Sequence, residues 1–110
     1  MKSKTLVSIS LSVIGLALGS VAQAQGAGSK EALYTRSLAA TCANCHGTDG
    51  KVVTGSPVTS LAGLDKSYFL AQMAAFKSGA RTATVMHQIS KGFNDAQIQS
   101  LASYFAEQKK

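Results

Sequence analysis

The two cysteines of this 110-residue chain lie three positions apart, and a histidine directly follows the second of them. The residues are Cys42, Cys45 and His46, in the stretch Cys-Ala-Asn-Cys-His. Thiolate sulfur and imidazole nitrogen are ligands for transition metals, and a pair of thiols can also form a disulfide or attach a cofactor. The stretch therefore indicates redox chemistry, a structural cross-link or a metal-containing group.

Three of the four interpretations of this stretch fit the sequence poorly. A disulfide between Cys42 and Cys45 would close so small a loop that it offers little chain-entropy stabilisation. A thioredoxin-like redox pair needs a βαβ context, whereas the sequence has no alternating strand pattern of useful length. A zinc site would need His87 beside His46 to complete its ligands. We keep the zinc-stapled structural domain as an alternative.

The fourth interpretation is covalent attachment of a haem, for which Cys-x-x-Cys-His is the c-type signature. Cys42 and Cys45 would lie one helical turn apart, so that their sulfur atoms reach two vinyl groups along one edge of a porphyrin and form thioethers. His46 would then lie under the ring with an imidazole nitrogen on the iron. We expect one covalently bound haem c at these three residues.

The first 24 residues have the organisation of a bacterial secretory signal peptide. Lys2 and Lys4 form a charged start, an apolar stretch follows, and Ala22-Gln23-Ala24 is a small-x-small cleavage site. The apolar stretch is short and contains serines and glycines, which disfavours the alternative of an uncleaved membrane anchor. We expect export to the periplasm, cleavage, a domain over residues 25–110 and no stable membrane span afterwards.

The charge of the chain is moderately basic. The formal net charge is +6, and Lys2 and Lys4 supply two of the eleven basic residues, so that residues 25–110 keep nine basic and five acidic residues, or +4. The basic residues are scattered and form no run interleaved with aromatics, which argues against nucleic-acid binding. Scattered lysines can still steer brief encounters with a protein partner.

Helical patterns dominate the remaining sequence. We expect three helices, over residues 30–41, 66–78 and 95–108. Asp65 and Asn94 are the predicted N-caps of the second and third helices, and Gly79 suits the position after the second. The stretches between the helices are predicted to be mostly loop. The fold class is all-α, and loops this long in a small domain indicate that a bound group organises them.

Taken together, these features resemble those of the class I cytochromes c, and the resemblance covers residues 30–108. The resemblance rests on CANCHGTDG, on GSPVTSLAGL and on VMHQISKGFNDAQIQSLASYF. The last stretch, with AFKSGAR before it, is more specifically similar to small haem domains of bacterial dihaem cytochromes c and to cytochrome subunits of flavocytochrome c sulfide dehydrogenases. The resemblance implies the class I cytochrome c fold, three main helices around one haem, and electron transfer without a catalytic site.

The resemblance also implies a second iron ligand from the loop before the last helix, which identifies Met86 as the candidate. Met73 is an alternative, although it lies between two phenylalanines on a helical stripe, where methionine is typically a core residue. His87 is a second alternative. Thioether ligation favours ferrous iron and raises the reduction potential.

Residues around the axial histidine have roles implied by the same resemblance. In proteins of this kind, a proline carbonyl after the haem motif accepts a hydrogen bond from the proximal imidazole, which implies that Pro57 orients His46. We expect Gly47 to permit close approach to the ring. Arg81 is a candidate partner of a haem propionate, with an ordinary solvated arginine as the alternative.

Several functions remain open at this stage. The first is a haem subunit that accepts electrons from a periplasmic flavoprotein oxidising sulfide or related sulfur compounds, with Val52, Val53 and Val58 at the contact. The alternative is a free-standing cytochrome c that passes electrons to an oxidase or reductase. An enzyme or gas sensor with an open iron position would require that neither Met86 nor Met73 binds the iron.

Overall fold

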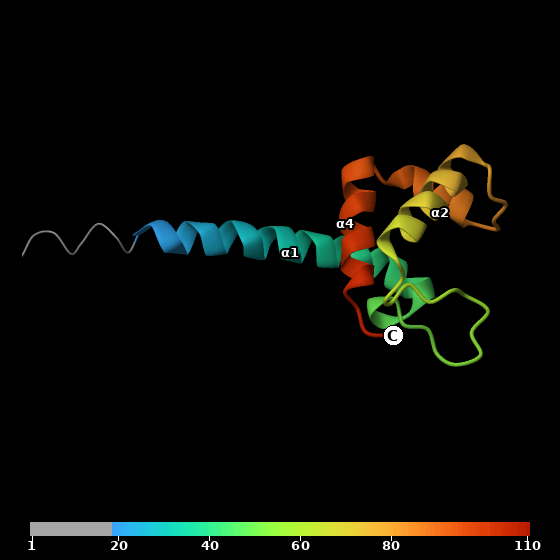
Figure 1. The fold of residues 1–110 in the computed structure, drawn as a ribbon, viewed down its shortest axis with the longest axis horizontal. Coiled ribbons are helices and arrows are strands. Elements are labelled where there is room, and N and C mark those ends of the chain that lie inside the picture. The colour runs from blue at the N-terminus through green and yellow to red at the C-terminus, as the bar shows by residue number, and fades with distance from the viewer. Residues whose placement is uncertain (1–18) are drawn as a thin grey trace, which may run out of the picture. The chain divides into compact units, whose positions relative to one another are not determined.

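A computed structural model describes the backbone of residues 19–110 and the side chains of residues 28–110. Its elements, shown in Figure 1, are α1 (Gly19–His46), the 3-10 helix η1 (Thr48–Gly50), α2 (Lys66–Ser78), α3 (Met86–Ile89), the 3-10 helix η2 (Ser90–Gly92) and α4 (Asp95–Ala106). This described part contains no strand, which confirms the expected all-α class. Most of the predicted signal peptide, residues 1–24, lies outside the described residues.

The chain divides into two units, residues 1–31 and residues 32–110. The second unit contains the end of α1 and every other element. No helix among residues 19–110 is long and apolar enough to cross a membrane.

The first helix is longer than the sequence pattern predicts. The helix predicted over residues 30–41 is the later part of α1, which begins at Gly19 and ends at His46. The extension to His46 has a local cause, because no glycine or proline lies between Gly28 and Gly47. At Gly47 φ is 79°, a left-handed value that ends the helix.

The helix caps agree closely with the predictions. The Asp65 side chain accepts a 2.9 Å hydrogen bond from the backbone N–H of Tyr68, and Gly79 follows α2 with φ of 80°. Asn94 and Gln97 form the expected capping box at the start of α4. The helix α4 ends at Ala106, two residues before the predicted end at Gln108, and Glu107 follows it with right-handed helical backbone angles.

The core is built where α2 and α4 pack together. Phe69 and Met73 of α2 are buried against four residues of α4, and Ala39 of α1 completes the cluster. The rings of Phe69 and Phe105 lie 5.9 Å apart between centroids. Burial of each large side chain of this kind stabilises the fold by about 1.5–3 kcal/mol, so this small cluster holds the helices that surround the site.

The loop after η1 is fixed to the C-terminal part of α4. Gly50 is buried, and its carbonyl accepts hydrogen bonds from the backbone N–H groups of Leu61 (2.7 Å) and Ala62 (3.1 Å). The N–H of Gly63 donates to the carbonyl of Phe105 over 2.8 Å. These bonds set the position of the residues just before Leu61.

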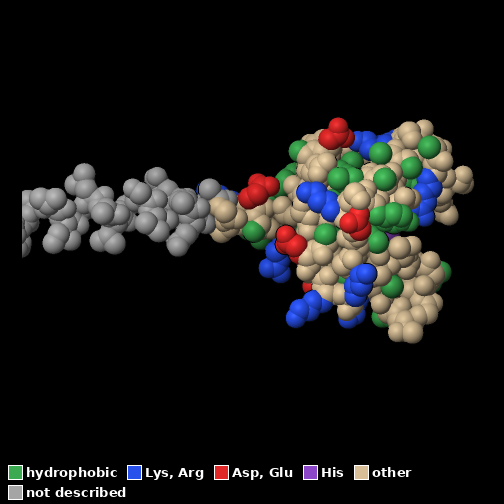
Figure 2. Space-filling view, viewed as in Figure 1, with side chains coloured by type: hydrophobic (Ala, Val, Ile, Leu, Met, Phe, Trp, Pro, Cys, Tyr) green, Lys and Arg blue, Asp and Glu red, His purple; other side chains and the backbone are tan. Residues whose placement is uncertain are grey.

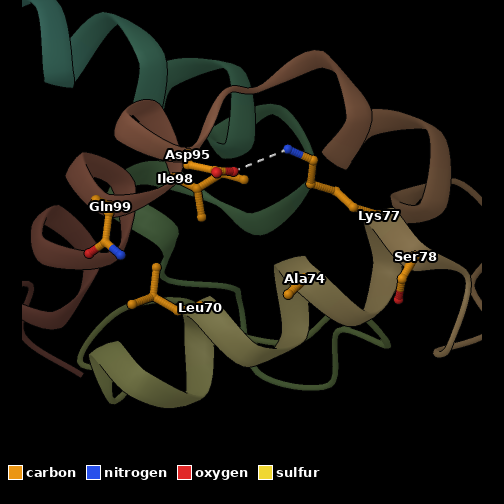
Figure 3. A pocket seen from close by; sticks show the side chains of 7 residues that line it. All are labelled: Leu70, Ala74, Lys77, Ser78, Asp95, Ile98 and Gln99. Atoms are coloured by element: carbon orange, nitrogen blue, oxygen red, sulfur yellow. Dashed lines mark ion pairs between the residues drawn. The ribbon is translucent and has the colours of Figure 1, made fainter.

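The segment before α4 has more regular structure than predicted. Residues 80–92 were expected to be mostly loop, yet α3 and η2 occupy its second half. Lys77 of α2 supports this segment, because its Nζ donates to the Phe93 carbonyl over 2.9 Å and lies 3.5 Å from Asp95 Oδ1. Figure 3 shows this ion pair beside a shallow pocket between α2 and α4.

Candidate functional site

One cavity of about 650 Å³ gathers the residues that the sequence singled out. Cys42, Cys45 and His46 line it from the end of α1, Met73 from α2 and Met86 from the start of α3. Its volume lies within the range of roughly 300–1,000 Å³ that is usual for small-molecule and cofactor sites. The fold thus brings together residues that are far apart in the sequence.

The remaining wall of the cavity is mostly apolar. It is formed by aliphatic and aromatic side chains from the loop, α2 and the segment around α3: Val58, Leu61, Leu64, Phe69, Phe76, Val85, Ile89 and Phe93. Such a lining excludes water and suits a large apolar ring. Tyr68, Gln72 and Thr84 also line the cavity, and the sequence analysis did not identify them because nothing in their local pattern marks them.

The two cysteines lie on the last turn of α1, where residues i and i+3 share one face. Neither forms a disulfide, and Cys45 is exposed whereas Cys42 is half-buried. Burial raises the pKa of the Cys42 thiol, an effect that a hydrogen bond with Thr41 partly offsets. Cys42 therefore stays a neutral thiol at neutral pH and is a poor candidate for a reactive redox thiolate.

The arrangement does not support the zinc alternative. Within residues 19–110, no group of three or more His, Cys, Asp or Glu side chains is close enough to hold a metal ion. His87, which would have been the fourth ligand, is not among the residues that line the cavity with His46.

The imidazole of His46 is oriented by a backbone carbonyl. Its Nδ1 lies 2.6 Å from the carbonyl oxygen of Thr59. Since a carbonyl can only accept, Nδ1 carries the proton and Nε2 keeps its lone pair for a metal. This is the tautomer that an iron-binding histidine needs.

The prediction that Pro57 supplies this carbonyl is wrong. The acceptor is Thr59, two residues further on, and Pro57 is exposed and does not line the cavity. The hydrogen bond from Leu61 N–H to the Gly50 carbonyl fixes the loop so that Thr59, rather than Pro57, lies opposite His46.

The turn that follows His46 explains the glycine at position 47. A Cβ atom on Gly47 would lie 2.1 Å from the carbonyl oxygen of Lys51, in addition to the left-handed φ. The close approach that excludes a side chain is therefore to the backbone of the turn itself. Tyr104 closes the same turn by donating a 2.6 Å hydrogen bond to Asp49, and this bond raises the pKa of Tyr104.

Arg81 lies at the edge of the cavity and is held by two neighbours. Its guanidinium donates a hydrogen bond to the side-chain oxygen of Gln72, and its Cζ lies 4.7 Å from the centre of the Phe76 ring. All three side chains line the cavity, although Arg81 itself is exposed. The guanidinium is thus fixed in direction at the mouth of the site.

The candidates for a second iron ligand differ in their surroundings. Met73 is only 5% exposed and packs within the core, as its position on a helical stripe predicts. Met86 is half-buried, lines the cavity and packs only at the margin of the core. His87 follows Met86 but lies outside the cavity lining. These placements favour Met86 over both alternatives.

Known proteins and one family model are similar to this chain in sequence. The family model for cytochrome c matches residues 32–109. The chain is 38% identical over 73 residues to the cytochrome subunit of sulfide dehydrogenase from Chlorobaculum tepidum, covering 66% of this chain and 64% of that protein. It is 36% identical over 110 residues to cytochrome c4 from Pseudomonas aeruginosa, covering 97% of this chain and 49% of that protein.

A third relative also has a name connected with sulfur compounds. The chain is 37% identical over 71 residues to the thiosulfate dehydrogenase electron acceptor from Thiomonas intermedia, covering 64% of this chain and 33% of that protein. The chain thus spans about half of the cytochrome c4 and less than two thirds of the other two relatives.

Proposed function

This chain belongs to the cytochrome c family, and we propose that it is a periplasmic one-electron carrier with a single haem, ligated by His46 and Met86. The helical structure agrees with the class I cytochrome c fold. The observation that supports the proposal best is the apolar cavity, which has both cysteines and His46 on its wall together with Met86. When bound there, haem supplies an iron centre that gains or loses one electron.

Each residue of the site has a distinct role in this proposal. Cys42 and Cys45 would hold the haem through thioethers, and His46 Nε2 would bind the iron because Thr59 keeps the proton on Nδ1. The thioether sulfur of Met86 would be the second iron ligand and would favour the reduced state of the iron. The apolar lining keeps water away, which raises the reduction potential further.

The partner in this proposal is a flavoprotein that oxidises sulfide or a related sulfur compound. The similarity to a sulfide dehydrogenase subunit and to a thiosulfate dehydrogenase electron acceptor supports it. A flavin reduced by two electrons must release them singly to a one-electron acceptor, which is the role of a haem subunit. Val53, which is 79% exposed, and Val85, at the cavity wall and 53% exposed, offer an apolar contact.

A free-standing carrier is the second candidate function. The match to cytochrome c4 over 97% of this chain favours it. On the face seen in Figure 2, lysine and arginine side chains are dispersed among acidic, apolar and other residues rather than gathered into one patch. Dispersed charge of this kind suits brief encounters with several partners.

Two experiments test these proposals in turn. A denaturing gel stained for haem should show covalent haem in the exported protein and none in a variant with both cysteines replaced by alanine. Affinity purification from the native host should then copurify a flavin, with the haem becoming reduced when sulfide is added. A flavin-free protein that ignores sulfide but is rapidly oxidised by host membranes would support the free carrier and reject the sulfide-oxidising partner.

A further inference from the structure

Two buried polar atoms beside the Met86 turn lack hydrogen-bond partners. Within residues 28–110, these are Nδ1 of His87 and Oγ of Ser90. Ser90 is fully buried, with 0% of its surface exposed. A buried polar atom left unpaired is destabilising, and such atoms in native proteins are usually satisfied by protein or by ordered water.

The two atoms belong to neighbouring positions on one continuous helical turn. Ile89 and Ser90 both have right-handed helical backbone angles, so the turn of α3 continues through Ser90. His87 and Ser90 are therefore i and i+3 neighbours, whose side chains lie next to each other. This spacing puts the two unpaired atoms on the same side of the turn.

The haem site does not supply the missing partner. Neither His87 nor Ser90 lines the cavity, whereas Met86 and Ile89 of the same turn do. The turn thus has one part at the cavity and another part directed into the protein. The polar atoms of His87 and Ser90 lie on that second part.

We propose that His87 and Ser90 hold one buried water molecule between Nδ1 and Oγ, and that this bridge anchors the turn from which Met86 reaches the cavity. Water suits these groups because a hydroxyl and an imidazole nitrogen can each donate or accept, and water can complement either. Buried water typically occupies such sites between otherwise unsatisfied polar groups. The functional part of this inference rests on the proposed ligation by Met86.

The anchor matters because α3 is only four residues long. A helix of this length has no stability of its own and takes its position from tertiary contacts. Weakening the bridge should let Met86 leave the iron more often, so that external ligands enter faster. We expect the loss of one hydrogen bond to speed ligand exchange about tenfold. A tenfold change in rate corresponds to about 1.4 kcal/mol of free energy.

Ligand exchange in the haem-loaded protein tests this role. The assay mixes oxidised protein with imidazole and follows the loss of the weak long-wavelength sulfur-to-iron absorption band. Ser90→Ala should accelerate the loss about tenfold. Ser100→Ala is the matched control, because the Ser100 hydroxyl bonds to the Ala96 carbonyl of its own helix, and it should leave the rate unchanged.

The sign of the Ser90 result decides between the bridge and a hydroxyl that is truly unpaired. Removing an unpaired buried hydroxyl relieves its desolvation penalty, so Ser90→Ala would then stabilise the protein and would not speed exchange. His87→Leu should reproduce the acceleration, and the double variant should be no faster than either single one, because both remove the same bridge. Unchanged exchange in Ser90→Ala, or additive effects, would reject the anchor.

A crystal structure of the haem-loaded protein tests the water directly. We expect an ordered water within about 2.7–3.2 Å of both His87 Nδ1 and Ser90 Oγ. A dry site, or a direct bond of either atom to protein, would overturn the inference. If wild-type protein lacks the sulfur-to-iron band, Met86 ligation fails instead, and the crystallographic water still decides whether the bridge exists.

Discussion

Replacement of Gly50 by alanine tests how the loop beside His46 is held. Gly50 has φ of 79° and is buried beneath the loop that carries Thr59. A Cβ atom at this position would lie 2.8 Å from Leu61 Cβ and 2.8 Å from Phe105 Cδ1. The substitution therefore combines a strained backbone with an overlap in the core.

The structure provides a control that separates these two effects. Gly55 has φ of 86°, and a Cβ atom there would meet nothing within 4 Å. Gly55→Ala should therefore lower the free energy of unfolding by only about 1–2 kcal/mol, the cost of a left-handed residue other than glycine. Gly50→Ala adds an overpacking cost of about 1–3 kcal/mol, so it should lose about 2–5 kcal/mol in all.

Urea unfolding of the haem-loaded proteins, followed by helical circular dichroism, measures both losses. The difference between the two variants reports the overlap with Leu61 and Phe105 alone. Since the Gly50 carbonyl fixes the loop just after Thr59, Gly50→Ala should also shift the reduction potential through His46. Equal losses of stability in the two variants would refute the packing argument at Gly50.

Further predictions concern the ligand, the core and the turn after His46. Met86→Ala should abolish the sulfur-to-iron band, whereas Met73→Ala should keep it and lower the free energy of unfolding by about 2–5 kcal/mol as a core truncation; the reverse pattern would exchange their roles. Tyr104→Phe should destabilise the protein by about 1 kcal/mol at neutral pH in urea titrations. The hydrogen bond to Asp49 raises the pKa of Tyr104 in the folded protein. The stabilisation from this bond is therefore complete below the pKa of about 10 that tyrosine has in the unfolded chain, and it is lost as pH rises through the higher pKa of the folded protein. An unchanged difference between wild type and Tyr104→Phe at strongly alkaline pH would contradict this assignment.

The features predicted best from sequence are those with local causes. Asp65 and Asn94 cap their helices through residues three positions away, and such caps are visible in a short window of sequence. The stripe containing Phe69 and Met73 follows from helical periodicity alone. The cysteine and histidine motif is similarly compact, since one helical turn places all its side chains together.

The features predicted less well depend on how distant segments meet. The short helix α3 has no cap hydrogen bond from a side chain and is too short to be recognised by periodicity. Its position depends on contacts with α2 and on the bonds of Lys77 to the segment that follows. Sequence could therefore identify Met86 as a ligand candidate only through resemblance, not through the structure that presents it.

The prediction that Pro57 supplies the carbonyl for His46 was wrong for a physical reason. The same reason applies wherever a side chain is oriented by a backbone group. Every residue has a carbonyl, so the bond from His46 to Thr59 depends on where the loop lies and not on which side chain it bears. The loop position is set by Gly50, whose buried backbone binds Leu61 and leaves no room for a side chain. The residue identity that constrains the orientation of His46 is therefore Gly50 under the loop, and substitution of Gly50 should perturb His46 more than substitution of the exposed Pro57.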